Sequence, residues 1–312
     1  MLTLDAAAVR EATPWNELIE SIAELLAGGT ANVPQREIHD VGLPGGGAGS
    51  LLVMPAWLDA ELLGVKAVTY FPSNAGTDLP TISAGFLLFD GRTGQLCATL
   101  DGDELTLRRT AAVSALAADR LARPDASGLL VVGTGKLAPN LALAHAAVRE
   151  FEVIEVWGRT PGNAAATARR LVSEGLPARP VEALDAAIGR ADIVTCATGA
   201  TSPLVSGELL GPGTHLDLVG SFRADMREAD DAAVLAATLF VDTLEGAVLA
   251  GDLAQPLASG VISGSNIAAD LASLVTGSHP GRTSDAEITL FKSVGFALSD
   301  LAAARLVHRR LS

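Results

Sequence analysis

The sequence of 312 residues is poor in aromatic residues and in cysteine. Aromatic side chains make up only 4% of it, which argues against surfaces that bind single-stranded nucleic acid by stacking. The two cysteines, Cys97 and Cys196, are far apart and belong to no Cys/His cluster, so a disulfide-dense scaffold and a zinc site of ordinary spacing are not expected. We therefore expect no metal, and we expect a reducing compartment.

Long apolar runs and positive charge are also scarce. No apolar run approaches the roughly 20 residues that a transmembrane helix needs, and the charged segment 1–15 lacks the apolar core of a signal peptide. The 22 Lys and Arg residues are outnumbered by 36 Asp and Glu residues, which gives a net charge of −14. A chain this acidic is a poor partner for nucleic acid or an anionic membrane, although a local basic pocket can still bind a small anion. We expect a cytoplasmic protein that binds neither.

Lysine is rare among the basic residues. Only Lys66, Lys136 and Lys292 occur, and all the others are arginines. Lys66 lies within the apolar β-type run LLGVKAVTYF, where its side chain either faces solvent or is buried with a partner. The scarcity of lysine in this chain favours a buried role for Lys66.

The length and the 49% hydrophobic content predict two domains with sizeable cores. The segment up to about residue 27 has helical spacing and ends at Gly28-Gly29. Residues 33–105 contain short β-type runs separated by turn signals, including a hairpin turn at 90–94, and they predict five or six antiparallel strands. A helix follows, with Thr106 as its expected N-cap.

From residue 128 onward, apolar strands alternate with helices. The strands are expected in GLLVVG, EVIEVWG, ADIVTCAT, THLDLVG and ATLFVD, which indicates an α/β fold with a doubly wound parallel sheet of the Rossmann type. The tail ITLFKSVGFALSDLAAARLVHRR is expected to be one long amphipathic helix that returns to the first domain. The predicted division is 1–112 plus 288–312 for the first domain and 113–287 for the second.

A glycine-rich motif follows the first of these strands and opens a helix. In such a GxGxxA turn, the first glycine permits the tight bend, the second admits a pyrophosphate, and the small last residue lets helix and strand pack closely. The alternative is a tight turn without a ligand, and Lys136 either pairs with a phosphate or is solvated. The predicted cofactor-binding residues of the motif are Gly133, Thr134, Gly135, Lys136, Leu137 and Ala138.

The end of the second strand bears on the choice of cofactor. NAD-binding proteins usually carry an acidic residue there, whereas Glu155 lies too early in this strand to reach the ribose. Arg159 and Thr160 suit the 2′-phosphate of NADPH. The alternative cofactor is NADH, and in that case Arg159 would stack on the adenine without selecting between the two cofactors. The small residues around Thr198 follow a later strand and are expected beside the middle of the dinucleotide.

Two adjacent arginines, Arg108 and Arg109, are expected in the first turn of the helix that Thr106 caps. Cations are unfavourable at a helix N-terminus unless an anion is bound there. We therefore interpret Arg109 as the ligand of a carboxylate or phosphate. The alternative is that both arginines face solvent or the nearby acidic residues Asp101, Asp103 and Glu104.

Several stretches together resemble the ornithine cyclodeaminase/μ-crystallin family. They are MPAWL, LGVKAVTYFPSN, LPTISAGFLLFDGRTGQLCATLDGDELTLRRTAAVSALAA, GTGKLA, HLDLVGSFRADMREAD and ITLFKSVGFALSDLAAA, and they cover nearly the whole chain. The resemblance implies a substrate-binding and dimerisation domain joined to an NADP(H)-binding Rossmann domain, and a homodimer.

The resemblance also implies roles for residues that no pattern explains alone. Arg36 and Arg109 would hold a substrate carboxylate, and Lys66 would act at the reacting centre. Lys66 and Arg109 are thus the implied catalytic residues. The implied neighbours of substrate are Met54 and Asn74, and those of the cofactor are Thr81, Thr110, Ser221 and Phe222.

One departure from the family pattern favours a particular activity. Cyclodeaminases carry an aspartate where this chain has Phe222. The segment HLDLVGSFRADMREAD is more similar to the branch that reduces Δ1-pyrroline-2-carboxylate and Δ1-piperideine-2-carboxylate with NADPH, giving L-proline or L-pipecolate. The alternatives are an ornithine cyclodeaminase, an alanine or other amino-acid dehydrogenase, and a non-catalytic NADP(H)-binding protein like the μ-crystallins.

Overall fold

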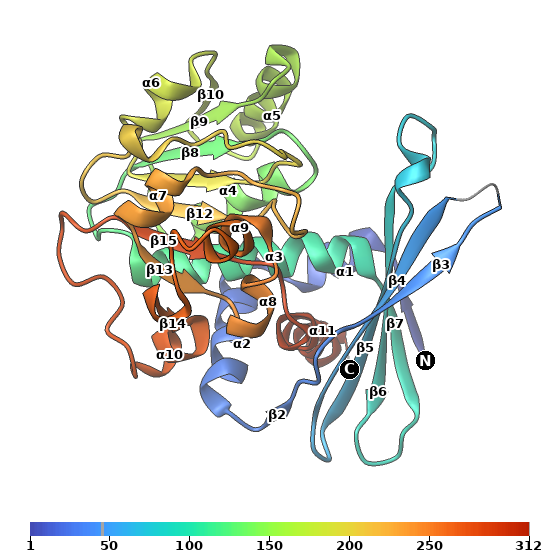
Figure 1. Cartoon of the computed structure of the whole chain (residues 1–312). Coiled ribbons are helices and arrows are strands. Elements are labelled where there is room, and N and C mark those ends of the chain that lie inside the picture. The colour runs from blue at the N-terminus through green and yellow to red at the C-terminus, as the bar shows by residue number, and fades with distance from the viewer. Residues whose placement is uncertain (45–46, 312) are drawn as a thin grey trace. The chain divides into compact units, whose positions relative to one another are not determined.

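The computed structural model describes residues 1–44 and 47–311, and it divides the chain into two units. Unit 1 comprises Met1–Arg109 and Phe296–Ser312, and unit 2 comprises Thr110–Gly295 (Figure 1). None of the helices among the described residues is long and apolar enough to cross a membrane.

Unit 1 contains a seven-stranded sheet in the order β1-β7-β6-β5-β4-β2, with β3 also paired to β4. Its strands are antiparallel except for the parallel pair β1–β7, which confirms the antiparallel region expected from the sequence. The strands are β1 (Leu2–Leu4), β2 (Ala31–Asn32), β3 (Glu37–Gly42), β4 (Ala48–Leu58), β5 (Leu62–Tyr70), β6 (Ile82–Asp90) and β7 (Leu96–Asp101).

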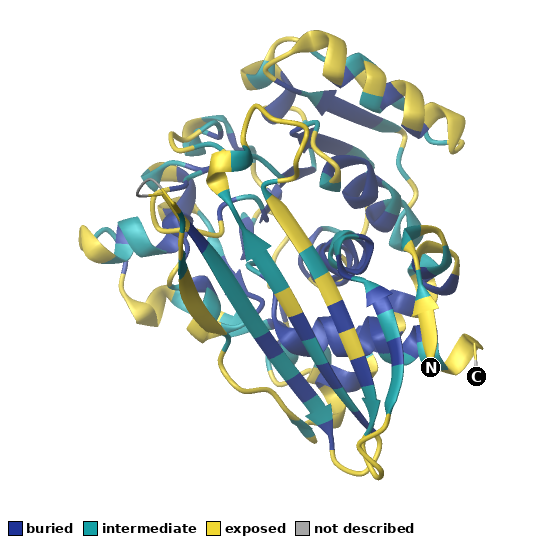
Figure 2. Ribbon diagram, turned by 90° about the vertical axis from the view of Figure 1, so that its right-hand side faces the viewer, coloured by how far each residue is buried: buried dark blue, intermediate teal, exposed yellow. Residues whose placement is uncertain are grey.

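Helices cover one face of this sheet, and burial therefore alternates along its strands (Figure 2). Helix α11 (Ala297–Leu311) packs on α2 (Trp15–Gly28) and on β4 and β5, and a short helix, α1 (Ala6–Ala12), precedes α2. A 3₁₀ turn, η1 (Pro72–Asn74), follows β5. Helix α2 ends as expected, because Gly29 adopts the left-handed conformation with φ of 61°.

Helix α3 (Gly102–Leu121) begins earlier than the sequence predicted. The carboxylate of Asp101 accepts the Glu104 N–H at 2.8 Å, so Asp101 takes the capping role assigned to Thr106. A side chain on Gly102 would come within 2.5 Å of the Ala84 backbone, which explains the glycine at the helix start. Arg109 consequently lies in the second turn, and the helix-terminus argument for a bound anion is wrong.

Unit 2 contains an eight-stranded, fully parallel sheet in the order β10-β9-β8-β11-β12-β15-β13-β14, which confirms the doubly wound α/β prediction. Its strands are β8 (Gly128–Val132), β9 (Val153–Trp157), β10 (Ala178–Pro180), β11 (Ile193–Cys196), β12 (His215–Leu218), β13 (Thr238–Val241), β14 (Ile267–Asp270) and β15 (Thr289–Lys292). Its helices are α4 (Leu137–Val148), α5 (Pro161–Ser173), α6 (Leu184–Ile188), α7 (Asp231–Ala236), α8 (Leu244–Ala247), α9 (Gly251–Ala258) and α10 (Leu271–Thr276), with 3₁₀ turns η2 (Gly207–Leu209) and η3 (Gly264–Asn266).

Strand β8 shows why these runs are continuously apolar. Leu130 and Val132 point into one core of unit 2, and Leu129 and Val131 point into the other. A parallel strand with helices on both faces has no polar side, so it cannot show the alternation typical of β4 or β6.

The tail is not the single helix that the sequence predicted. Residues 289–292 form β15, which pairs with β12 on one side and β13 on the other. Only α11 belongs to unit 1, so the units divide at 295/296 and 109/110 rather than at 287/288 and 112/113. The apolar run ITLFK fits a helix and a buried strand equally well, because such a short run has no distinctive period.

Candidate functional site

The turn between β8 and α4 is built around two glycines with different roles. Gly133 has φ of 128°, and a side chain on it would lie 2.5 Å from the Ala197 carbonyl oxygen. Its N–H donates to the Trp157 carbonyl at 2.9 Å, which ties the turn to the end of β9. Gly135 has no heavy atom within 4 Å of the place a Cβ would take, so its backbone is open to a ligand.

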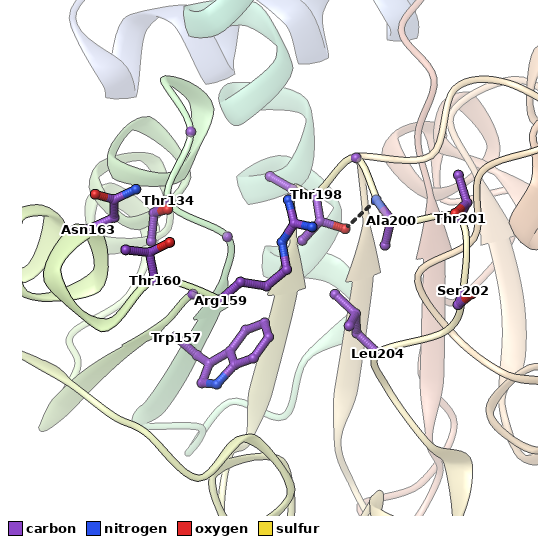
Figure 3. A pocket seen from close by; sticks show the side chains of 15 residues that line it. Thr134, Trp157, Arg159, Thr160, Asn163, Thr198, Ala200, Thr201, Ser202 and Leu204 are labelled. Atoms are coloured by element: carbon purple, nitrogen blue, oxygen red, sulfur yellow. Dashed lines mark hydrogen bonds between the residues drawn. The ribbon is translucent and has the colours of Figure 1, made fainter. Parts of the chain in front are cut away.

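A pocket of about 480 Å³ lies above the ends of β8, β9 and β11 (Figure 3). Six of the predicted cofactor-binding residues line it, namely Gly133, Thr134, Gly135, Arg159, Thr160 and Thr198. The small residues expected around Thr198 also line it, namely Ala197, Gly199, Ala200 and Thr201. The structure adds five residues that were not among the predicted contacts, and these are Trp157, Gly158, Asn163, Ser202 and Leu204. The pocket thus forms at the carboxyl ends of parallel strands, where ligands bind in doubly wound sheets.

The charges around the pocket favour an anion at the end of β9. The carboxylate of Glu155 accepts hydrogen bonds from Arg179 and Arg190 and does not line the pocket. Arg159 makes no ion pair with any acidic group among the described residues, and its side chain points toward the loop carrying Thr198 (Figure 3). The pocket therefore offers a guanidinium where an NAD-type site usually has a carboxylate.

These features fit a pyridine dinucleotide. The open backbone at Gly135 and the start of α4 would hold the pyrophosphate, and Arg159 with the Thr160 hydroxyl would hold a 2′-phosphate. Gly158 lets the end of β9 pack closely against this turn, because a side chain there would come within 2.5 Å of Thr134.

A buried carboxylate fixes the other wall of the pocket. Glu228 accepts the N–H and the hydroxyl of Thr198 at 2.7 and 2.8 Å through Oε1, and the N–H groups of Gly220 and Ser221 at 2.8 and 3.2 Å through Oε2. Desolvation raises the pKa of Glu228 to about 7. Glu228 thereby holds together the loops that follow β11 and β12, a role that the sequence did not reveal.

Other predicted cofactor residues lie outside the pocket lining. Lys136 is exposed at the start of α4, and Ala138 is buried where helix and strand meet. The Ser221 hydroxyl donates to the Met226 carbonyl at 3.0 Å, and Phe222 is 44% exposed. Leu137 is half-buried and Thr110 is buried. The sequence thus predicted the position of the turn correctly, but it predicted the individual residues that line the pocket less well.

A second cluster lies within unit 1 and joins two predicted residues through an unpredicted one. The Lys66 ammonium nitrogen lies 2.8 Å from both carboxylate oxygens of Asp300, and Arg109 Nε donates to Asp300 Oδ1 at 2.8 Å. Lys66 and Asp300 are almost fully buried. Strand β5, helix α3 and helix α11 each supply one member of the cluster.

The electrostatics of Lys66 follow from this burial. Desolvation and the neighbouring Arg109 lower the pKa of Lys66, and the charge and hydrogen bond of Asp300 raise it again. Arg36 contributes a smaller lowering effect, and the resulting pKa is about 8. The confirmed burial of Lys66 excludes the alternative of a solvent-facing strand lysine.

The remaining predicted substrate residues, and the predicted cofactor neighbour Thr81, are distributed around β4 and β5. Met54 is buried directly opposite Lys66 in the register of the two strands. Arg36 is half-buried and lies close enough to affect Lys66. Asn74 donates its amide to the Pro80 carbonyl at 2.8 Å, and the Thr81 carbonyl accepts the Phe71 N–H at 2.7 Å, so both close the loop after β5.

Arg108 has a structural role that the sequence did not predict. Its guanidinium is buried, donates to the Thr13 hydroxyl at 3.0 Å and to the Thr13 carbonyl, and stacks 3.6 Å from the centre of the Trp15 ring. The alternative that both arginines face solvent or the nearby acids Asp101, Asp103 and Glu104 is therefore wrong, because Arg108 binds Thr13 and Arg109 binds Asp300. Glu104, one of those acids, pairs instead with Arg10.

Asp300 is the residue of this cluster that sequence reasoning missed. The sequence did contain an indication of it, because Asp300 is the acidic residue in the otherwise apolar run FALSDLAAA. This part of α11 is buried on most sides, so a carboxylate there cannot be solvated by water. A buried charge needs a partner, and Asp300 has two, Lys66 and Arg109.

The comparisons with known proteins agree with this architecture. The family model of the ornithine cyclodeaminase/mu-crystallin family matches residues 3–312. The chain belongs to this family. The resemblance read from its motifs is thereby confirmed.

Three similar proteins narrow the comparison. The Delta(1)-pyrroline-2-carboxylate reductase of Paracoccus denitrificans is 40% identical over 95% of this chain and 92% of its own length. The protein SAR DEFICIENT 4 of Arabidopsis thaliana is 43% identical over 89% of this chain and 87% of its own. The structure of the Thermococcus litoralis Delta(1)-pyrroline-2-carboxylate reductase with NADH and L-proline has a TM-score of 0.93 at 35% identity, covering 99% of this chain and 97% of the other.

Proposed function

We propose that this protein is an NADPH-dependent reductase of cyclic imino acids. It would convert Δ1-pyrroline-2-carboxylate or Δ1-piperideine-2-carboxylate to L-proline or L-pipecolate. The buried Lys66–Asp300–Arg109 cluster carries the proposal, since it combines a carboxylate-binding guanidinium with an ammonium group near its titration range. The family's pyrroline-2-carboxylate reductases, at 36–40% identity, support an oxidoreductase that acts on C=N bonds.

The cofactor assignment rests on Arg159. This guanidinium lines the pocket without an acidic partner among the described residues, and Thr160 beside it offers a hydroxyl. Both groups suit the 2′-phosphate of NADPH. The relative from Thermococcus litoralis was solved with NADH, so the proposed preference for NADPH rests on Arg159 and Thr160 of this chain alone.

The cofactor supplies the hydride, and the residues of unit 1 would prepare its acceptor. Arg109 is held by its Nε, and its two outer nitrogens have no hydrogen-bond partner among the described residues, so this fork can bind the substrate carboxylate at two points. Arg36 would add a second cation for the same carboxylate. Lys66 would hold the imine nitrogen in its protonated form, and this protonation makes the adjacent carbon electrophilic.

We also propose a cytoplasmic homodimer. The low cysteine content supports a reducing compartment. Family resemblance supports the dimer, and an archaeal alanine dehydrogenase with a TM-score of 0.90 is described as a dimer.

A substrate panel tests the proposal. Purified protein is mixed with pyrroline-2-carboxylate, piperideine-2-carboxylate, pyruvate plus ammonia, or ornithine, each with NADPH and with NADH. The proposal requires NADPH oxidation with the cyclic imines. Ammonia release from ornithine without net cofactor change would identify a cyclodeaminase, turnover of pyruvate plus ammonia alone would identify an alanine dehydrogenase, and cofactor binding without turnover would identify a μ-crystallin-like binding protein.

A further inference from the structure

The buried cluster of unit 1 contains two cations and one carboxylate. Lys66 and Arg109 both contact Asp300, and Asp300 has no exposed surface. Without Asp300, two positive charges would be buried side by side with no anion, which is among the most unfavourable arrangements in a protein interior. The carboxylate therefore decides whether this site can exist with both cations charged.

We propose that Asp300 is a positioning residue for the reductase reaction: it fixes the orientation of Arg109 and keeps Lys66 protonated while the site is empty. This inference rests on the proposed function. Asp300 does not touch the substrate; it acts through the two side chains that do.

The geometry at Arg109 supports the first half of this role. Asp300 accepts only the inner Nε–H, at 2.8 Å, so the two outer nitrogens remain available to a substrate carboxylate. A protein carboxylate bound to the two outer nitrogens of Arg109 would instead compete with the substrate carboxylate. Asp300 thus orients the guanidinium without occupying its binding face.

The geometry at Lys66 supports the second half. The ammonium lies equally close to both oxygens of Asp300, and the buried Met54 lies opposite Lys66 on the neighbouring strand. The charged groups that influence Lys66 are Arg109, Arg36 and Asp300, and only Asp300 favours the protonated amine. Removal of its charge leaves burial and two cations, all of which favour the neutral amine.

The protonation state of Lys66 can be measured directly because the sequence contains only three lysines. Protein labelled with ¹⁵N-lysine gives three side-chain resonances, from Lys66, Lys136 and Lys292, and Lys136→Arg assists their assignment. The pH titration of the Lys66 resonance is recorded for the wild type, for Asp300→Asn and for Glu104→Gln. Glu104 is another buried carboxylate of unit 1, and it pairs with Arg10, so its variant is a control.

We expect the Lys66 pKa to fall by about 1–3 in Asp300→Asn and to remain unchanged in Glu104→Gln. An unchanged Lys66 titration in folded Asp300→Asn overturns the proposal. If Asp300→Asn does not fold, the wild type decides the question: a Lys66 amine that is neutral at pH 7 overturns the proposal, and an ammonium supports it.

Activity provides the second readout. In Asp300→Asn, kcat/KM for the cyclic imine should fall about a hundredfold, the size of effect expected from a displaced clamp, with the Kd for NADPH within twofold of wild type. Asp300→Glu keeps the charge and should recover part of the loss. The NMR titration needs no substrate, so a wild type that reduces no imine would overturn the proposed function while leaving the counter-ion role testable.

Discussion

Arg109 and Asp300, 191 residues apart in sequence, are joined by a hydrogen bond of 2.8 Å from the arginine Nε. Arg109 reaches this position from the second turn of α3, and the approach of α11 to the sheet brings Asp300 to it. The pair explains why Arg109 is buried although, among the described residues, its side chain has no partner on its own helix.

Arg109→Lys should therefore lose activity although it keeps the charge. A lysine cannot donate one N–H to Asp300 and also present a planar fork to a carboxylate. We expect kcat/KM for the cyclic imine to fall about a hundredfold, as a misplacement near 1 Å can cause, while NADPH affinity stays near wild type. Steady-state kinetics with both substrates varied, together with a fluorescence titration of NADPH, provide the measurement.

The control for this variant must be an exposed arginine. Arg108 is unsuitable, because its guanidinium holds Thr13 and stacks on Trp15. Arg120 lies on the same helix with its side chain about half exposed, so Arg120→Lys should be nearly neutral. If Arg109→Lys matched Arg120→Lys in kcat/KM, Arg109 would not be the carboxylate ligand.

Arg159→Ala should discriminate between the two cofactors. A charge-assisted hydrogen bond is worth about 1.5–3 kcal/mol, so NADPH affinity should fall roughly tenfold to a hundredfold while NADH affinity changes little. Fluorescence titrations with each cofactor give the comparison. Equal losses for NADPH and NADH would mean that Arg159 stacks on the adenine and does not select the 2′-phosphate.

Glu228→Gln should loosen the pocket wall without removing a group that faces the ligand. A glutamine has one carbonyl oxygen and therefore cannot accept the four hydrogen bonds that Glu228 receives from Thr198, Gly220 and Ser221. We expect weaker binding of both NADPH and NADH, by about tenfold, because unmet buried donors cost about 1–3 kcal/mol. Glu208→Gln, in turn η2, is the control in the same titration, and a Glu228→Gln affinity equal to it would contradict the role.

The parts of this fold that the sequence predicted correctly are those specified by local chemistry. The GxGxxA turn follows from the φ of 128° at Gly133, a backbone conformation that favours glycine. The end of α2 at Gly29 and the hairpin turn, in which Asp90 accepts N–H groups of Arg92 and Thr93, are also local. A single segment contains all the information needed for each.

The parts that the sequence could not supply depend on contacts between distant segments. The role of Asp300 depends on the packing of α11 next to Lys66. The role of Glu228 depends on the meeting of the two loops that follow β11 and β12. Strand β15 is recognisable only from its neighbours β12 and β13. The start of α3 was missed because two capping residues, Asp101 and Thr106, compete in sequence, and the packing of Gly102 against Ala84 selects the first.

The last prediction concerns acid stability and follows from a buried histidine. His145, in α4, is completely enclosed, and its Nδ1 lies 2.8 Å from the Leu141 carbonyl oxygen. Burial lowers the pKa of His145 to about 4. Between pH 6.5 and 4 the unfolded chain binds more protons at this residue than the folded one, so stability is lost as the pH falls through this range.

The loss attributable to His145 is about 3 kcal/mol between pH 6.5 and pH 4, which is large for one side chain. His145→Phe removes the titration, so its melting temperature should decline less steeply over this range than that of the wild type, even if the variant is less stable at pH 7. His215 is also buried with a lowered pKa, so some acid sensitivity will remain. Calorimetric melting between pH 4 and 7 provides the test, with the exposed His39→Phe as control. Parallel declines in the wild type and His145→Phe would show that His145 is not the residue whose protonation destabilises the fold.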